Sequence, residues 1–193
     1  MKDYQVIENF LLPEKCQELI VLSENKGYDE ADISYADGPK MNKSYRDNSR
    51  CLYEDENLRL ELESLLQPLT PKTTTYIKPG GIIEHLEFIK LSGKFRFYKY
   101  EPGQKFKKHR DGNVLEEGGV SLYTVLFYLN TAEEGGETGI YDYDFPDKQL
   151  IKAETGKLLI FNHTVPHTGE ELKKGVKYVL RTDFIYKTPS VVE

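Results

Sequence analysis

The second half of the chain is a succession of strand-like segments that no long helical pattern interrupts. These segments are rich in β-branched and aromatic residues. They are FRFYKY at 95–100, SLYTVLFYLN at 121–130, KLLIFN at 157–162 and VKYVLRTDFIY at 176–186. Turn signals separate them, among them Pro102-Gly103, Gly118-Gly119, Gly135-Gly136 and Gly175. Strands without intervening helices predict an antiparallel sandwich or barrel rather than a parallel α/β sheet.

The first third of the chain has a helical pattern instead. Pro13 suits the first turn of a helix that Gly27 can close. A second helix is expected from residue 56 to residue 66, with leucines along one side. A polar loop from residue 34 to residue 50 lies between them. We therefore predict a mainly β chain with N-terminal helices (α+β), in which a single domain over 1–193 has a helical support region at 1–80 and a β core at 81–188.

Composition narrows the possible function classes. The chain is 38% hydrophobic and 30% charged, which is typical of a globular protein rather than a disordered one. Its net charge of -6 gives no general attraction to phosphate backbones, so nucleic acid is disfavoured as a partner. We expect neither a signal peptide nor a membrane span. Cys16 and Cys51 are too few for a disulfide framework, and two buried free thiols predict a cytoplasmic protein.

Three of the chain's polar residues form a candidate metal site. His109 and Asp111 are two residues apart, and such residues on a strand point to the same face. His167, which follows the KLLIFN segment, offers a third ligand. Two histidines and one carboxylate leave three positions of an octahedral metal open, as in non-haem iron(II) oxygenases. The His-x-Asp pair alone is a weak signal, because a surface histidine beside a solvated aspartate gives the same pattern.

A second pattern, H-x-G-x5-G-x-K from His167 to Lys177, strengthens the metal hypothesis. Lys177 lies in the segment VKYVLRTDFIY, whose other residues are mostly apolar or β-branched, so the pattern predicts a cation in the interior. A buried lysine is costly unless it has an anionic partner. The C5 carboxylate of 2-oxoglutarate would supply such a partner.

These motifs, taken in order, resemble the prolyl 4-hydroxylase-like branch of the 2-oxoglutarate/iron(II) dioxygenases. The resemblance covers residues 95–186, with a looser match through ENFLLPEKCQELI and RDNSR. It implies a double-stranded β-helix core, which is a cupin-like jelly roll. It also implies iron(II), 2-oxoglutarate and O2, with ascorbate as a further reductant. The reaction implied is hydroxylation of an unactivated C–H bond with release of succinate and CO2.

The resemblance also implies roles for individual residues. His109, Asp111 and His167 match the iron ligands. Lys177, ten residues after the second histidine, matches the basic residue that pairs with the C5 carboxylate of 2-oxoglutarate. Arg181 lies on the same face of the same strand and remains an alternative for that cation, since arginine gives the better bidentate contact. Its other expected role is an ion pair with a neighbouring aspartate, Asp183.

Further side chains are expected around the cosubstrate. Tyr128 matches a tyrosine whose hydroxyl bonds the same C5 carboxylate, and Thr124, four residues earlier on the same face, should line the pocket. Tyr100 matches a tyrosine near the cosubstrate and substrate. The remaining histidines, His85 and His163, are expected to have structural roles, because His163 lacks the downstream glycine and lysine spacing.

The basic segment KSYRDNSR at 43–50 is either a solvated loop or a substrate lid. The resemblance at Arg46, Asn48 and Arg50 predicts that these residues bind substrate. The expected substrate is a prolyl or other side chain of a protein or peptide. A free amino acid or other small molecule is the open alternative, and nothing in the sequence separates the two. An alternative from a different functional class is a catalytically silent, metal-binding jelly roll used for interaction. Such a protein would need neither the full ligand set nor Lys177, so their presence argues against it.

Overall fold

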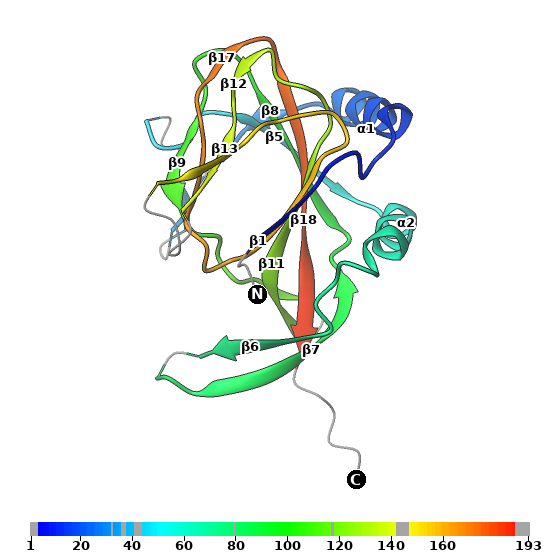
Figure 1. The fold of residues 1–193 in the computed structure, drawn as a ribbon, viewed down its shortest axis with the longest axis vertical. Helices are drawn as coiled ribbons and strands as arrows, with labels where there is room; N and C mark the ends of the chain where they lie inside the picture. The colour runs from blue at the N-terminus through cyan, green and yellow to red at the C-terminus, as the bar shows by residue number, and fades with distance from the viewer. Residues whose placement is uncertain are drawn as a thin grey trace.

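The computed structural model describes residues 4–31, 33–35, 38–40, 44–78, 80–116, 118–141 and 147–187. In these ranges the chain is mainly β, with helices α1 (Pro13–Lys26) and α2 (Glu56–Leu66) (Figure 1). Both helices have the predicted ends: Pro13 opens α1, Gly27 follows it, and the side chain of Asp55 accepts a hydrogen bond from the Leu58 amide at the start of α2. Neither helix is long and apolar enough to span a membrane.

The largest sheet has antiparallel strands in the order β1-β15-β11-β18-β8-β5-β2. Their bounds are β1 (Tyr4–Ile7), β15 (Leu158–Asn162), β11 (Gly119–Tyr128), β18 (Lys177–Lys187), β8 (Lys94–Tyr100), β5 (Ser49–Glu54) and β2 (Asp29–Glu30). Three further strands extend it: β10 (Leu115–Glu116) pairs with β11, β7 (Ile83–Leu91) pairs with β18, and β6 (Thr73–Ile77) pairs with β7.

A smaller sheet faces the main one and has the order β14-β13-β16-β9. It consists of β14 (Gln149–Ile151), β13 (Thr138–Ile140), β16 (His167–Gly169) and β9 (Phe106–His109). Two short pairs complete the strands, β12 (Glu134–Gly135) with β17 (Leu172–Lys174) and β3 (Ile33–Tyr35) with β4 (Gly38–Lys40). Figure 1 shows β9 and β13 to the left of the long strands β11 and β18, and both helices to their right. The main sheet therefore lies between a helical layer and the smaller sheet.

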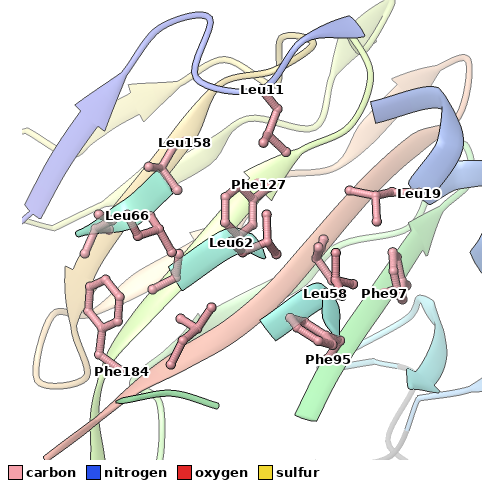
Figure 2. Packing of buried hydrophobic residues seen from close by; sticks show 14 of the residues in the cluster. Leu11, Leu19, Leu58, Leu62, Leu66, Phe95, Phe97, Phe127, Leu158 and Phe184 are labelled. Carbon is pink, nitrogen blue, oxygen red and sulfur yellow. The ribbon is translucent and has the colours of Figure 1, made fainter. Parts of the chain in front are cut away.

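Alternate residues of the central strands supply two separate hydrophobic cores. The helix-side core contains Phe97, Phe127, Leu158 and Leu180, which pack against the leucines of α1 and α2 (Figure 2). The neighbouring residues Tyr98, Tyr128, Leu159 and Val179 face the other way, toward Ile140 of β13 and Leu172 of β17. Because both faces of these strands are buried, their sequences are continuous apolar runs rather than alternating ones.

The first 80 residues contain more strand than the helical pattern predicts. β1 and β5 belong to the main sheet, and the polar loop predicted from residue 34 to residue 50 includes most of β3, all of β4 and the start of β5. These strands are short and form by pairing with distant segments, so they have little local signal. Lys43, at the start of the predicted lid, lies outside the described residues. The single-domain organisation stays a prediction, whereas both cysteines are free and buried as expected.

Leu62 on α2 tests the contribution of the helical layer to stability. Its side chain is fully buried in the helix-side core, so we expect Leu62→Ala to reduce the free energy of unfolding by about 2–5 kcal/mol. Leu60→Ala is the matched control on the same helix, because Leu60 is 51% exposed and should change stability by less than about 0.5 kcal/mol. Urea denaturation of both variants measures the difference. Equal losses would contradict this account of the packing.

Candidate metal and cosubstrate site

Two antiparallel strands of the smaller sheet bring the predicted ligands together. His109 ends β9, His167 begins β16, and their Cα atoms are paired across the two strands. Asp111 lies two residues beyond the end of β9, so its position depends on the loop rather than on strand alternation. Nevertheless, ligand atoms of the three side chains all lie within 4.8 Å of one another. The structure therefore brings together the three residues that the sequence predicted as metal ligands.

Hydrogen bonds to backbone carbonyls orient both imidazoles. The Nδ1 atom of His109 is 2.8 Å from the carbonyl oxygen of Lys107, and that of His167 is 3.1 Å from the carbonyl oxygen of Val165. A carbonyl can only accept, so each Nδ1 carries the proton and each Nε2 keeps its lone pair. The Nε2 atoms lie 4.0 and 3.8 Å from the carboxylate oxygens of Asp111. The donor atoms thus converge on the space between the three side chains.

The protonation state of the three residues suits a divalent metal. Burial lowers the pKa of His109 to about 3 and also lowers the pKa of His167, so both imidazoles are neutral at pH 7. Burial acts to raise the pKa of Asp111, but the positive charge of Arg181 and smaller contributions from the neighbouring histidines together outweigh burial and hold that pKa below its ordinary range. Neutral imidazoles and an ionised carboxylate are the forms that bind metal. Two histidines and one carboxylate match the donor set of a non-haem iron(II) site.

A polar network behind the ligands fixes the Asp111 carboxylate. Thr124 Oγ1 donates to Asp111 Oδ2 at 2.5 Å, and Arg181 Nη1 donates to Oδ1 at 2.8 Å. Arg181 Nη2 also donates to Asp183 Oδ1 at 3.1 Å, which is the ion pair expected from the sequence. His163 Nε2 lies 3.3 Å from the same Asp183 oxygen. His163 therefore lies in the network and not among the three grouped metal-ligand candidates, while the contact of Arg181 with a metal ligand was not anticipated.

The three ligands face a cavity of about 50 Å³ whose lining includes the predicted cation. Lys177 is 2% exposed, its Nζ donates to the carbonyl oxygen of Gly136 at 2.7 Å, and it lies 4.2 Å from the centre of the Tyr100 ring. Burial lowers the pKa of Lys177 to about 8, although Glu137 and Glu170 act to raise it. The acceptor of the Lys177 hydrogen bond is a neutral carbonyl. A bound anion would therefore stabilise the positive charge of the Lys177 ammonium group.

The predicted tyrosines and threonine lie at different places relative to the cavity. Thr124 and Tyr100 line it. Tyr128 is fully buried but is absent from the cavity lining, and its hydroxyl donates to Thr138 Oγ1 at 2.6 Å. Thr138 lines the cavity in its place. Thr138 is not predicted from the sequence, because a threonine in a strand is ordinary and only the Gly-Gly-Glu turn before it gives a signal.

Two consecutive glycines shape the turn that holds Lys177. Gly135 and Gly136 both have a φ of 74°, a left-handed conformation that side chains disfavour. A Cβ atom on Gly135 would lie 2.3 Å from the carbonyl oxygen of Glu171. Their conformation aims the carbonyl of Gly136 at the ammonium group of Lys177.

The predicted lid residues lie at the mouth of the site. Arg46 and Arg50 line a groove that adjoins the metal ligands. Asn48 does not line it, and its Oδ1 instead accepts a hydrogen bond from Arg46 Nε at 2.8 Å. His85 is exposed on β7, away from the ligands.

The similarity of this chain to known proteins supports the assignment of the metal ligands. The 2OG-Fe(II) oxygenase superfamily model matches residues 95–184, which include all three ligands. "Putative prolyl 4-hydroxylase" of Acanthamoeba polyphaga mimivirus is 26% identical over 195 residues, covering 90% of this chain and 70% of that protein. "Probable prolyl 4-hydroxylase 10" of Arabidopsis thaliana is 30% identical over 140 residues, which are 69% of this chain but 43% of the plant protein. This chain therefore spans less than half of the plant relative.

A solved structure shows the same fold. A prolyl hydroxylase from Trichoplax adhaerens, in complex with a hypoxia inducible factor oxygen degradation domain peptide fragment, gives a TM-score of 0.70 at 18% identity. The match covers 95% of this chain and 84% of the other. The two facing sheets are thus the predicted double-stranded β-helix. The chain belongs to the 2OG-Fe(II) oxygenase superfamily as a prolyl 4-hydroxylase-like dioxygenase whose facial triad is His109, Asp111 and His167.

Proposed function

We propose that this enzyme hydroxylates an unactivated C–H bond in a prolyl or other side chain of a protein or peptide, with release of succinate and CO2. The observation that carries the proposal is the placement of the triad and a buried cation on one cavity. His109, Asp111 and His167 would hold iron(II), which together with 2-oxoglutarate supplies the activation of O2. Ascorbate belongs to the proposal as the reductant that keeps the metal in the iron(II) form.

The chain's own residues would bind and orient the cosubstrate. Lys177 is the better partner for the C5 carboxylate, because Arg181 is already engaged by Asp111 and Asp183. Thr138 Oγ1 accepts a hydrogen bond from the Tyr128 hydroxyl, so the hydroxyl hydrogen of Thr138 is left to donate into the cavity. The role expected of Tyr128 would therefore be exerted through Thr138.

Two observations support a peptide substrate. The cavity continues into an open groove of about 650 Å³, which has room for more than one residue of an extended chain. The viral and plant relatives carry the names "Putative prolyl 4-hydroxylase" and "Probable prolyl 4-hydroxylase 10", and the Trichoplax neighbour was solved with a peptide.

Turnover of defined substrates tests the proposal. The protein is incubated with iron(II), 2-oxoglutarate, ascorbate and O2, with proline-containing peptides in one arm and free proline in another. We expect succinate to form slowly without substrate and faster with a peptide that gains one oxygen. Asp111→Ala is the inactive control. If the metal-loaded protein forms no succinate in any arm, the silent interaction module becomes the better explanation.

A further inference from the structure

The groove beside the metal ligands is continuous with the inner cavity. Five residues line both of them: Tyr98, Phe106, His109, Asp111 and Arg181. The rest of the groove is formed by Tyr45, Arg46, Arg50, Arg96, Arg110, Gly112, Asn113 and Val114. Because the groove adjoins the ligands and is open, a substrate that reaches the metal lies along it.

The charge of this groove differs from that of the whole protein. The chain has six arginines, and five of them line the groove, whereas the sixth, Arg59, forms ion pairs with Glu56 and Glu63 on α2. Among the described residues that line the groove there is one carboxylate, that of Asp111. The chain as a whole carries a net charge of -6. Positive charge is therefore concentrated at the approach to the metal ligands.

At least one of these arginines is held in a fixed position. Arg46 is 7% exposed, and its guanidinium lies 4.8 Å from the centre of the Tyr98 ring and 4.7 Å from the centre of the Phe106 ring. Its Nε donates to Asn48 Oδ1, and Asn48 in turn donates to the carbonyl of Ser49. Aromatic stacking and these hydrogen bonds order the cation before a ligand arrives.

Among the described residues that line the groove, arginines outnumber carboxylates. Arg96 and Arg181 share the carboxylate of Asp183, and a divalent metal would neutralise the charge of Asp111. Arg181 Nε is also buried without a hydrogen-bond acceptor among the described residues. Burial acts to raise the pKa of Tyr98, yet the surrounding arginines hold that pKa below its ordinary value. The inner end of the groove, at Tyr98 and Arg181, therefore has a positive field that suits a bound anion.

We propose that the substrate carries carboxylate groups close to the hydroxylated carbon and that the arginines of this groove bind them. This inference rests on the proposed function and names its substrate class, an acidic peptide segment. Guanidinium groups form paired hydrogen bonds with carboxylates, which favours arginine over lysine in such a site. An extended polyanion such as a nucleic acid would meet a net negative protein beyond the groove.

Matched peptides test the charge preference directly. Three labelled peptides share a central proline and differ only in its flanking residues, which are aspartate, asparagine or lysine. Their binding to the manganese(II)-loaded protein with 2-oxoglutarate is measured by fluorescence anisotropy at low and high salt. We expect the aspartate peptide to bind at least about tenfold more tightly than the asparagine peptide, and the lysine peptide to bind most weakly. Added salt should reduce the advantage of the aspartate peptide.

Variants of one exposed arginine assign the preference to the groove. Arg110 does not contact a triad carboxylate, and its Nε donates to the carbonyl of Thr164. Arg110→Gln should reduce the advantage of the aspartate peptide by about tenfold, and Arg110→Glu should shift the preference toward the lysine peptide. Lys174→Gln is the charge-matched control, since Lys174 is outside the groove and 70% exposed. Circular dichroism verifies the fold of each variant.

The outcomes separate this inference from the proposed function. If the three peptides bind equally, or the lysine peptide binds best, while succinate still forms, the inference is wrong and the proposed function stands. If no succinate forms, the proposed function fails first. Displacement of the aspartate peptide by free aspartate at similar concentration supports carboxylate recognition but assigns it to a small acid. Tighter binding of a single-stranded oligonucleotide than of any peptide overturns the inference.

Discussion

Replacement of His167 by alanine should abolish 2-oxoglutarate turnover and weaken metal binding by roughly a hundredfold or more, since loss of an outer-shell partner alone already costs 10–100-fold. His167 contributes one of three converging donors, and it begins the strand opposite His109. The imidazole is neutral in the metal-free protein, so its removal leaves no uncompensated buried charge. Titration calorimetry with manganese(II) measures the affinity, and succinate formation with iron(II) measures the turnover.

Two other histidines serve as controls for this variant. His85→Ala removes an exposed imidazole on β7 and should leave metal affinity unchanged. His163→Gln removes a buried imidazole next to Asp183, so it should affect metal affinity less than His167→Ala. The ligand assignment would be wrong if His163→Gln abolished metal binding while His167→Ala retained it.

The second large effect concerns the cosubstrate: Lys177→Met should weaken 2-oxoglutarate binding by at least about thirtyfold. Methionine keeps most of the apolar contacts of the side chain but removes the charge. Loss of one partner of a desolvated, hydrogen-bonded charge pair typically costs about 2–5 kcal/mol, from which the fold-change follows. Binding is measured by calorimetry on the manganese(II)-saturated protein, so that changes in metal affinity do not contribute.

The pH dependence of binding gives Lys177 a distinct signature. Its pKa is about 8 because burial disfavours the charged form, and the ammonium form is the one that binds a carboxylate. The affinity for 2-oxoglutarate should therefore be constant below pH 8 and fall by about tenfold for each pH unit above it. In Lys177→Met this contribution should be absent, so the difference between the two pH profiles isolates Lys177.

Two variants control for the choice of cation. Lys157 is also buried, at 5% exposure, but it already pairs with Glu8 and Glu154, so Lys157→Met should not alter 2-oxoglutarate affinity. Arg181→Ala should weaken metal binding first, because Arg181 holds Asp111. If the metal-saturated Arg181→Ala protein lost cosubstrate affinity while Lys177→Met retained it, Arg181 would be the cosubstrate's cation.

The features that the sequence predicted well have local or motif-based signals. The two helices have proline, glycine or capping residues at their ends, and the long central strands are apolar because both of their faces are buried. The metal ligands were found through the His-x-Asp pair and the spacing from His167 to Lys177. In each case the relevant residues are close together in the chain or have a fixed spacing.

The features that the sequence did not predict depend on contacts between distant segments. β1 has four residues and exists through its pairing with β15, more than 150 residues away. Thr138 of β13 lines the cavity, whereas Tyr128 of β11 lies behind it and bonds its hydroxyl, a contact between two strands that the sequence of either one cannot reveal. The arginines of the groove come from segments near residues 46, 96, 110 and 181, and only the fold makes them neighbours.

The pairing of His109 with His167 has a consequence for the order of the smaller sheet. β9 has four residues and β16 has three, and their register is irregular just beyond the histidine pair. If β16 slipped by one residue against β9 in such a short ladder, the imidazole of His167 would turn away from the cavity. A metal that joins both histidines works as a cross-link that holds the two strands in register. Loss of the metal would therefore loosen the edge of the jelly roll that the substrate meets. Substrate binding would then weaken together with turnover.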